Sequence, residues 1–291
     1  MPFRTLVSAP DLAAHLGDAE WLAVDCRFQL ADAAWGEREY LTSHIPGASY
    51  AHLNTDLSAP LTGTNGRHPL PNPDVLVRTF TRLGIRNGMQ VVAYDQDNGM
   101  FASRLWWLLR WMGHTDVAVL DGGFKKWTAE HRPVAAGRAD RAHGSPALPT
   151  PFAGAPRHDM TADVDDVARI VTRGDALLLD ARAPERYRGD LEPLDRVPGH
   201  IPGAANHFFQ DNVDEQGVFR PAAELRERLS AAMGSTPPAQ VVCYCGSGVT
   251  ACQNLLAMEV AGLSGAKLYG GSWSEWSSDP QRPVERSTSS T

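Results

Sequence analysis

The pentapeptide His-Ile-Pro-Gly-Ala stands at residues 44–48 and again at residues 200–204. Other landmarks recur around the two copies in the same order. An apolar run that ends in aspartate precedes each copy, at residues 21–25 and 176–180. A second apolar run follows each copy, at residues 91–95 and 241–245. A segment with tryptophan comes later, at residues 122–127 and 271–276. The members of each pair lie 149 to 156 residues apart. Because the order is kept and the separations drift by only a few residues, the sequence predicts a duplicated domain.

Within each copy, short apolar runs alternate with longer segments of helical period, at residues 102–112, 221–233 and 250–261. Strands that alternate with helices are typical of an α/β domain with a mostly parallel sheet flanked by helices. Ligands of such sheets bind where the strands end and loops lead into helices. The loop after the apolar run 241–244 is therefore the first place to look for a functional site.

The length of 291 residues also agrees with two domains. Residues 136–158 are rich in proline, glycine and alanine and lack a sustained apolar period, which predicts a linker between a first domain at 1–135 and a second at 159–291. The tail from Ser277 onward has a similar composition, and we expect it to be loosely held.

Composition excludes several classes of protein. With 43% hydrophobic and 21% charged residues, the chain is typical of globular proteins. The net charge of −7 lacks the basic excess of a nucleic-acid-binding protein. No apolar run approaches the roughly 18 residues that span a bilayer, and the first residues do not resemble a signal peptide, so we expect a cytoplasmic protein without a membrane partner. Four cysteines are too few for a disulfide framework, and reduced thiols are expected.

One of these cysteines has the setting of a nucleophile. The loop Cys-Gly-Ser-Gly-Val-Thr at residues 245–250 follows an apolar strand and opens a helix. Its glycines allow successive backbone N–H groups to turn toward one point, and the positive end of the helix lies nearby. Such a site favours a thiolate at Cys245 and would hold a persulfide anion in the same way. The alternative is a buried structural cysteine in an ordinary strand-to-helix turn.

The duplication, the two pentapeptides and the loop 245–250 together resemble the two-domain rhodanese-like sulfurtransferases, most closely those that use 3-mercaptopyruvate. The resemblance covers nearly the whole chain and implies two tandem rhodanese-like domains. Relatives that prefer thiosulfate carry basic residues directly after the cysteine, whereas Gly246 and Ser247 are neutral. Asp95 stands in the first copy where Cys245 stands in the second, which implies that the first domain is catalytically silent.

The resemblance implies a reaction in which Cys245 takes sulfur from 3-mercaptopyruvate, releases pyruvate, and passes the sulfur to a thiol or cyanide acceptor. Thioredoxin or a sulfur-carrier protein is an implied acceptor, and no metal or organic cofactor is implied. Two arginines would grip the carboxylate or enolate of the donor, because a guanidinium is a planar fork of donors. The residues implied to bind the donor are Arg186, Arg196, Gly246, Gly248, Val249 and Thr250.

The family also has a Ser-His-Asp relay, and its members here are Ser247, His68 and Asp56. Ser247 follows the nucleophile by two residues, so its hydroxyl could pass a proton to or from the substrate. The alternative for His68 is a solvated histidine in a surface loop.

The other cysteines carry weaker signals. Cys243 and Cys245 could suggest a metal pair, but no second pair lies at zinc-site spacing, so no metal site is expected. Cys252 lies near the start of the helix after the loop and could act as a resolving thiol for a persulfide, with packing as the alternative role.

Three classes of function remain open. The first is a sulfurtransferase that uses 3-mercaptopyruvate, with thiosulfate as the alternative donor. The second is a cysteine phosphatase, which needs a longer loop closed by an arginine, where this chain has Thr250 and Ala251. The third is a non-catalytic module that carries sulfur or senses oxidants through Cys245.

Overall fold

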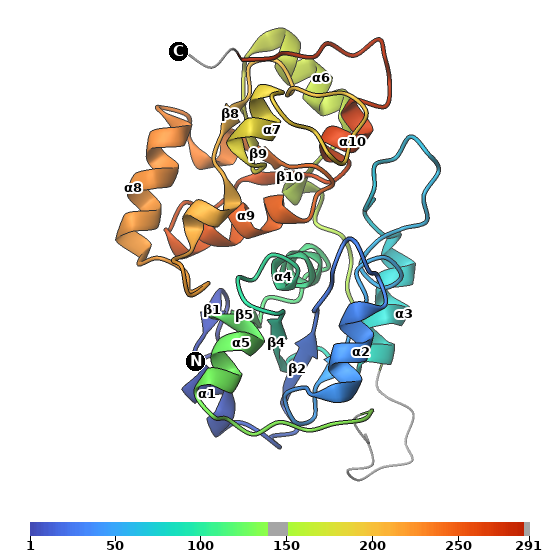
Figure 1. Ribbon diagram of the computed structural model, residues 1–291, viewed down its shortest axis with the longest axis vertical. Helices are drawn as coiled ribbons and strands as arrows, with labels where there is room; N and C mark the ends of the chain where they lie inside the picture. Colours follow the sequence, from blue (N-terminus) through green and yellow to red (C-terminus); the bar gives the residue numbers. More distant parts are fainter. Residues whose placement is uncertain (139–150, 288–291) are drawn as a thin grey trace. The chain divides into compact units, whose positions relative to one another are not determined.

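The computed structural model describes residues 1–138 and 151–287 (Figure 1). The middle of the expected linker, residues 139–150, and the end of the tail, residues 288–291, lie outside the described residues. The chain divides into two compact units. The first consists of Met1–Ala59, Pro71–Arg157 and Glu215–Phe219, and the second of Pro60–Leu70, His158–Asp214 and Arg220–Thr291. The short segment 60–70 therefore belongs by its contacts to the second unit, which the order of the sequence does not reveal.

The first unit alternates strands and helices. Its elements are β1 (Leu6–Val7), α1 (Ala9–Ala14), β2 (Trp21–Asp25), α2 (Trp35–Thr42), β3 (Ser49–Tyr50), α3 (Pro73–Leu83), β4 (Gln90–Tyr94), α4 (Ala102–Trp111), β5 (Val117–Leu120) and α5 (Gly123–Ala129). The strands form a parallel sheet in the order β1-β5-β4-β2-β3. Helix α4 packs on β4 and β5.

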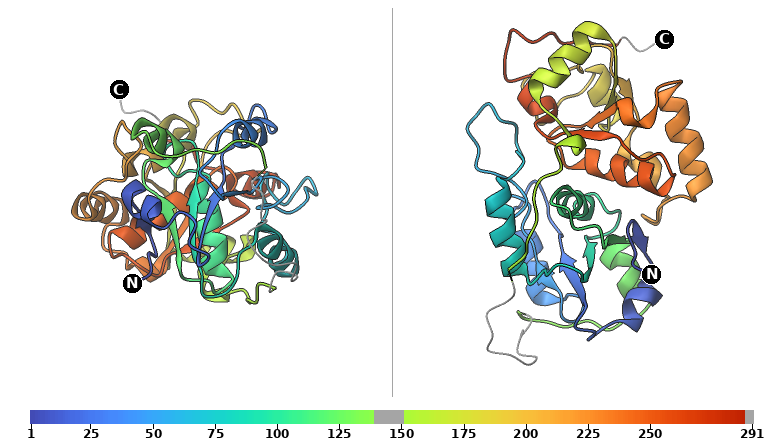
Figure 2. Two further views of the ribbon diagram at one scale, coloured as in Figure 1. Left: turned by 90° about the horizontal axis from the view of Figure 1, so that it is seen from below. Right: turned by 180° about the vertical axis from the view of Figure 1, so that it is seen from behind.

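The second unit repeats this plan (Figure 2). Its elements are η1 (His158–Met160), β6 (Thr161–Ala162), α6 (Val164–Arg173), β7 (Leu177–Asp180), α7 (Pro184–Arg188), β8 (Ala205–Asn206), η2 (Phe209–Asn212), α8 (Ala222–Met233), η3 (Pro238–Gln240), β9 (Val241–Tyr244), α9 (Thr250–Val260), β10 (Lys267–Tyr269) and α10 (Ser272–Trp276). The parallel sheet has the order β6-β10-β9-β7-β8, so equivalent strands hold equivalent places in the two sheets. The expected α/β fold with two tandem domains is confirmed.

Local sequence explains where several helices begin and end. Asp163 caps α6 by accepting the backbone N–H of Asp166, whose side chain accepts the N–H of Asp163 in return. Gly174 ends the same helix in the left-handed conformation, which a glycine adopts without a Cβ penalty. The expected helices at 102–112, 221–233 and 250–261 are present with ends that differ by at most one residue.

The repeated motifs meet in space within each unit. Asp25 ends β2 and pairs in register with Tyr94 at the end of β4. Its carboxylate accepts the Tyr94 hydroxyl at 2.9 Å and binds the Arg27 guanidinium. The Tyr94 hydroxyl in turn accepts the N–H of Ile45 in the pentapeptide at 3.3 Å. The second unit repeats this network with Asp180, Tyr244, Arg182 and Ile201. The repeat is therefore a buried polar network that joins two strands and a turn.

The tail is better held than its composition predicts. Glu285 forms a backbone bridge with His200 of the second pentapeptide, as Ala135 does with His44 in the first unit. The Trp276 indole donates to the carbonyl of Pro283 at 2.9 Å. The expectation of a loosely held tail is therefore wrong for residues 277–287, because pairing through the backbone needs no apolar period.

Candidate active site

Cys245 is the first residue after β9, and the loop that it opens leads into α9. Its side chain is buried, and the backbone N–H of Gly248 donates to Cys245 Sγ at 3.1 Å. Gly248 has a φ of +77°, and a Cβ there would collide with the carbonyl of Gly270. Only a glycine at position 248 therefore allows this loop conformation, in which the backbone N–H of residue 248 points toward Cys245 Sγ.

A second segment holds the loop from the side. Trp273 N–H donates to the carbonyl of Cys245 at 2.9 Å, and Ser274 N–H donates to the carbonyl of Gly246 at 3.0 Å. The Ser272 hydroxyl accepts the N–H of Cys245 at 3.1 Å. Ser272 has a φ of +56°, which is uncommon for a residue with a side chain. The start of α10 thus fixes the peptide of Cys245 at the expense of local backbone strain.

The structure brings Ser247 and His68 together. His68 Nδ1 lies 2.8 Å from Ser247 Oγ, at hydrogen-bond distance, and both side chains are buried. His68 belongs to the segment 60–70, which is part of the second unit. The alternative of a solvated surface histidine is therefore wrong, since His68 is only 7% exposed.

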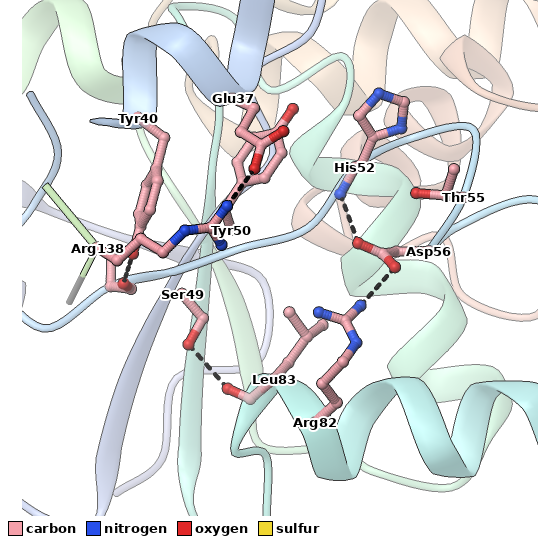
Figure 3. Close-up of a pocket in the computed structure, with 11 residues that line it drawn as sticks. Glu37, Tyr40, Ser49, Tyr50, His52, Thr55, Asp56, Arg82, Leu83 and Arg138 are labelled. Atoms are coloured by element: carbon pink, nitrogen blue, oxygen red, sulfur yellow. Dashed lines mark hydrogen bonds and ion pairs between the residues drawn. The ribbon is translucent and has the colours of Figure 1, made fainter. Parts of the chain in front are cut away.

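Asp56, the third expected member of the relay, lies in the first unit. Its carboxylate forms an ion pair with Arg82 and accepts the backbone N–H of His52 at 2.9 Å (Figure 3). These three residues line a pocket of about 530 Å³ in that unit. The recorded partners of Asp56 are thus a guanidinium and a peptide N–H, and its place in a relay stays a prediction.

The two expected donor-binding arginines differ in their surroundings. The Arg186 guanidinium lies against Gly246. A Cβ built on that glycine would stand only 3.4 Å from Arg186 Nη2. Arg186 Nη2 donates to Glu192 at 2.7 Å and to Asp195 at 3.2 Å. Arg196 is exposed, and within residues 1–138 and 151–287 no hydrogen bond or ion pair of its guanidinium is recorded. A role for Arg196 therefore stays a prediction.

Two residues of this site were missed by the sequence analysis. Ser272 lies in the repeated segment 271–276, but the repeat does not reveal that its hydroxyl binds the peptide of Cys245. Arg67 precedes His68, and its guanidinium also lies against Gly246. No local pattern indicates this contact, because the two residues are 179 positions apart.

The remaining two thiols of this unit pack close to the loop. Cys252 Sγ lies 3.3 Å from the carbonyl of Gly248, at the distance of a weak hydrogen bond. Cys243 Sγ lies 3.9 Å from the sulfur of Met258, and burial raises the pKa of the Cys243 thiol. These positions explain how both thiols pack, and a role of Cys252 as a resolving thiol stays a prediction.

The equivalent loop of the first unit holds a carboxylate. Asp95 follows β4, and Phe124 N–H donates to its carbonyl at 2.8 Å as Trp273 N–H does to that of Cys245. Four backbone N–H groups donate to the Asp95 carboxylate at 2.8 to 3.2 Å, from Asp97, Gly99, Phe101 and Ala102. The backbone N–H groups of this loop therefore bind a carboxylate of the chain itself, where the loop of the second unit has the thiol of Cys245.

Burial raises the pKa of Asp95 from 3.8 to about 6, against the lowering effect of its backbone donors. The native carboxyl thus holds its proton more tightly than the unfolded one. Its contribution to stability is fully present below about pH 4 and is lost as the pH rises through about 6. We expect the free energy of unfolding of the wild type, relative to Asp95→Asn, to fall by about 2 kcal/mol between about pH 4 and pH 7. Urea titrations at the two pH values measure it, and parallel profiles for the two proteins would contradict the burial argument.

Among the described residues, no helix has both the length and the apolar character needed to cross a bilayer. In the same part of the chain, no three His, Cys, Asp or Glu side chains gather in a way that could hold a metal ion.

Comparison with known proteins identifies the family. The Rhodanese-like domain matches residues 8–130 and again 163–279. A Pseudomonas aeruginosa protein provisionally named a 3-mercaptopyruvate sulfurtransferase is 46% identical over 98% of this chain and 99% of its own length. SseB of Mycobacterium tuberculosis, provisionally named a thiosulfate sulfurtransferase, is 38% identical over 98% of both chains. The crystal structure of SseA from Escherichia coli, described as a 3-mercaptopyruvate sulfurtransferase, has a TM-score of 0.78 and 30% identity, and the match covers 94% of this chain and all of SseA. The chain therefore belongs to the rhodanese family and carries two copies of its domain.

Proposed function

We propose that this protein is a sulfurtransferase that moves sulfur from 3-mercaptopyruvate through a persulfide on Cys245 to a thiol or cyanide acceptor. The observation that carries the proposal is the hydrogen bond from the Gly248 N–H to Cys245 Sγ at 3.1 Å. The conformation of the loop that allows this bond requires a glycine at position 248. A backbone donor fixed in this way stabilises negative charge on sulfur, both in the thiolate and in a persulfide. The membership of the rhodanese family supports the same chemistry.

The first half-reaction conserves atoms and charge. The Cys245 thiolate attacks the sulfur of 3-mercaptopyruvate, so that an S–S bond forms and the C–S bond breaks. The electron pair of the broken bond leaves with pyruvate as its enolate. The proton of the donor thiol ends on the methyl carbon of pyruvate, and Cys245 holds a persulfide anion. In the second half-reaction, an acceptor thiolate or cyanide attacks the outer sulfur and the Cys245 thiolate is regenerated.

Ser247 and His68 supply the route for that proton. The hydroxyl of Ser247 follows the nucleophile by two residues and lies 2.8 Å from His68 Nδ1. A hydroxyl bound to an imidazole can accept a proton on one side and give one up on the other. Ser247 thus links the donor thiol to the enolate, with His68 as its partner in proton exchange.

Arg186 supplies positive charge for the donor. Its guanidinium lies beside the residue that follows Cys245, where the 2-oxo acid group of the donor would lie when its sulfur meets Sγ. A planar guanidinium matches a carboxylate or enolate with two parallel hydrogen bonds. The proposal extends to a cytoplasmic location and to thioredoxin or a sulfur-carrier protein as acceptor.

Thiosulfate is the second candidate donor, and the provisional name of SseB favours it. The loop itself disfavours thiosulfate, because Gly246 and Ser247 supply no positive charge to bind this doubly negative donor. The phosphatase alternative lacks a loop arginine, since Thr250 and Ala251 follow Val249. A carrier or sensor module would use the same Cys245 without turnover.

The test compares the two donors with cyanide as a common acceptor. We expect faster turnover with 3-mercaptopyruvate than with thiosulfate, together with one pyruvate released per sulfur transferred. Faster turnover with thiosulfate would reject the assigned donor and keep the persulfide mechanism. No turnover with either donor would reject the enzyme in favour of a carrier or sensor module, and cleavage of an aryl phosphate that depends on Cys245 would favour the phosphatase.

A further inference from the structure

Glu285 shows how a carboxylate binds at the pentapeptide of the second unit. Its Oε2 accepts the backbone N–H of Gly203 at 3.0 Å and lies 3.8 Å from His200 Nε2. Glu285 is held there because its backbone forms an antiparallel bridge with His200, with N···O distances of 2.9 and 3.0 Å. The turn at residues 200–203 thus binds a carboxylate of the chain itself.

The first unit has the same turn without that carboxylate. His44 forms the equivalent bridge with Ala135, and both of its N···O distances are 2.8 Å. Gly47 has a φ of +78° where Gly203 has +75°, so the two turns share their backbone conformation. Alanine stands at position 135 where the second unit has Glu285, and the methyl group of an alanine cannot accept a hydrogen bond.

Two polar groups of the first turn lack a partner among the residues that the structure describes. His44 is only 1% exposed, and its Nε2 has no hydrogen-bond partner there. The other ring nitrogen, Nδ1, lies 2.8 Å from the carbonyl of Tyr40, which can only accept, so Nδ1 carries a proton. In the same part of the chain, no hydrogen bond of the Gly47 N–H is recorded. The two groups that face Glu285 in the second unit are therefore unpaired in the first.

A pocket of about 540 Å³ lies beside this turn, and all of its described lining residues belong to the first unit. The turn residues His44 and Gly47 line it, as does Ala135. Apolar side chains from α1, from the turn after it and from β2 line it too, and they are Leu12, Leu16 and Trp21. The ring of His15 stacks on Trp21 with 3.9 Å between the ring centroids, which gives the pocket a flat aromatic surface. Apolar walls with a few polar groups are typical of a site for a small molecule.

We propose that this pocket binds a small apolar carboxylic acid, whose carboxylate takes the place that the Glu285 carboxylate takes in the second unit. The ligand carboxylate would accept the Gly47 N–H and lie next to the ring of His44. A carboxylate there favours the charged form of the ring, in which Nε2 carries a proton as well as Nδ1. The apolar part of the acid would pack on Trp21 and Leu16. This site lies in the first unit, so the inference does not rest on the proposed function.

The other charged side chains of the pocket suit a ligand with a single negative group. Arg138 lines the pocket, and its exposed guanidinium donates to Glu37 at 2.8 Å. Asp18 also lines the pocket, and its Oδ1 accepts the backbone N–H of Glu20 at 2.9 Å. A ligand thus meets one guanidinium and one carboxylate besides the two histidines. A second negative group on the ligand would have no further cation among the described lining residues.

The test uses phenylacetate, an aromatic ring that carries one carboxylate, and the full-length protein. We expect saturable binding with a Kd of about 1 mM or tighter, which an NMR titration measures. 2-Phenylethanol has the same ring and no carboxylate. It should bind about tenfold more weakly, because it cannot replace the charged group that accepts the Gly47 N–H.

Ala135→Glu gives the first unit the residue that the second unit has. The new carboxylate should occupy the site and weaken phenylacetate binding about tenfold or more. Val134→Glu is the matched control, since Val134 is 50% exposed and is not among the described lining residues. This control should bind phenylacetate within about twofold of wild type, because solvent and salt screen its charge. If Ala135→Glu does not fold, Ala136→Glu replaces it, since Ala136 is exposed and also lines the pocket.

Binding that is lost in Ala135→Glu and kept in Val134→Glu would support the inference. Equal weakening in both variants would show a general charge effect and would overturn it. An absence of saturation up to about 10 mM phenylacetate would also overturn it. So would binding that persists in Ala135→Glu and disappears in Arg186→Gln, because the probe would then bind beside Gly246. These measurements need no turnover, so their outcome is independent of the assay for sulfur transfer.

Discussion

We expect Cys245→Ala to abolish both sulfur uptake and pyruvate release and to lower turnover about 10⁴-fold or more, because it removes the proposed nucleophile. Two of the other three thiols are poorly suited to replace it. Cys26, Cys243 and Cys252 are buried, and burial raises the pKa of Cys26 and of Cys243. Neither of those two thiols is therefore ready to ionise. Intact mass of the protein after exposure to 3-mercaptopyruvate measures the uptake, with a gain of one sulfur atom for the wild type and none for the variant.

Cys26→Ala is the matched control. Cys26 is a buried thiol of the first unit whose Sγ lies 3.8 Å from the carbonyl of Val24, and we expect its variant to take up sulfur like the wild type. A sulfur adduct that persisted in Cys245→Ala and disappeared in Cys26→Ala would refute the assignment of the nucleophile.

Gly248→Ala is expected to lower kcat/KM for the donor by about two to three orders of magnitude, as for the loss of one fixed backbone donor. The physical cause is twofold. A Cβ at this position would collide with the carbonyl of Gly270, and the φ of +77° is unfavourable for alanine. The loop must shift, and the N–H that lies 3.1 Å from Cys245 Sγ must shift with it. Rates of persulfide formation in single turnovers measure the effect.

Gly174→Ala separates the collision from the general cost of a left-handed alanine. Gly174 ends α6 with a φ of +66°, and a Cβ there would meet nothing within 4 Å. This control should lose about 1 kcal/mol of stability and keep its activity. Equal activity in Gly248→Ala and wild type would mean that the Gly248 donor does not assist the thiolate.

Much of the fold could be predicted because its signals are local or repeated. The run at residues 241–244 is the strand β9, and the helical period from Thr250 is the helix α9, within one residue at its end. The duplicated motifs predicted two equal units because each copy builds the same buried network, as Asp25 and Tyr94 show in the first unit. The tail after Ser277 could not be predicted in this way, since its pairing with His200 runs through the backbone.

The sequence by itself determined the duplicated parallel-sheet fold and the strand-to-helix loop that begins at Cys245, because strand period, helix period and glycine spacing act over a few residues. Only the tertiary structure decided what surrounds that loop. The segment 60–70 lies in the first half of the sequence but belongs by its contacts to the second unit. There His68 lies at hydrogen-bond distance from Ser247, and Arg67 lies against Gly246 and forms an ion pair with Asp195. Such contacts join residues more than 100 positions apart, and they depend on how the folded chain packs, which no local pattern encodes.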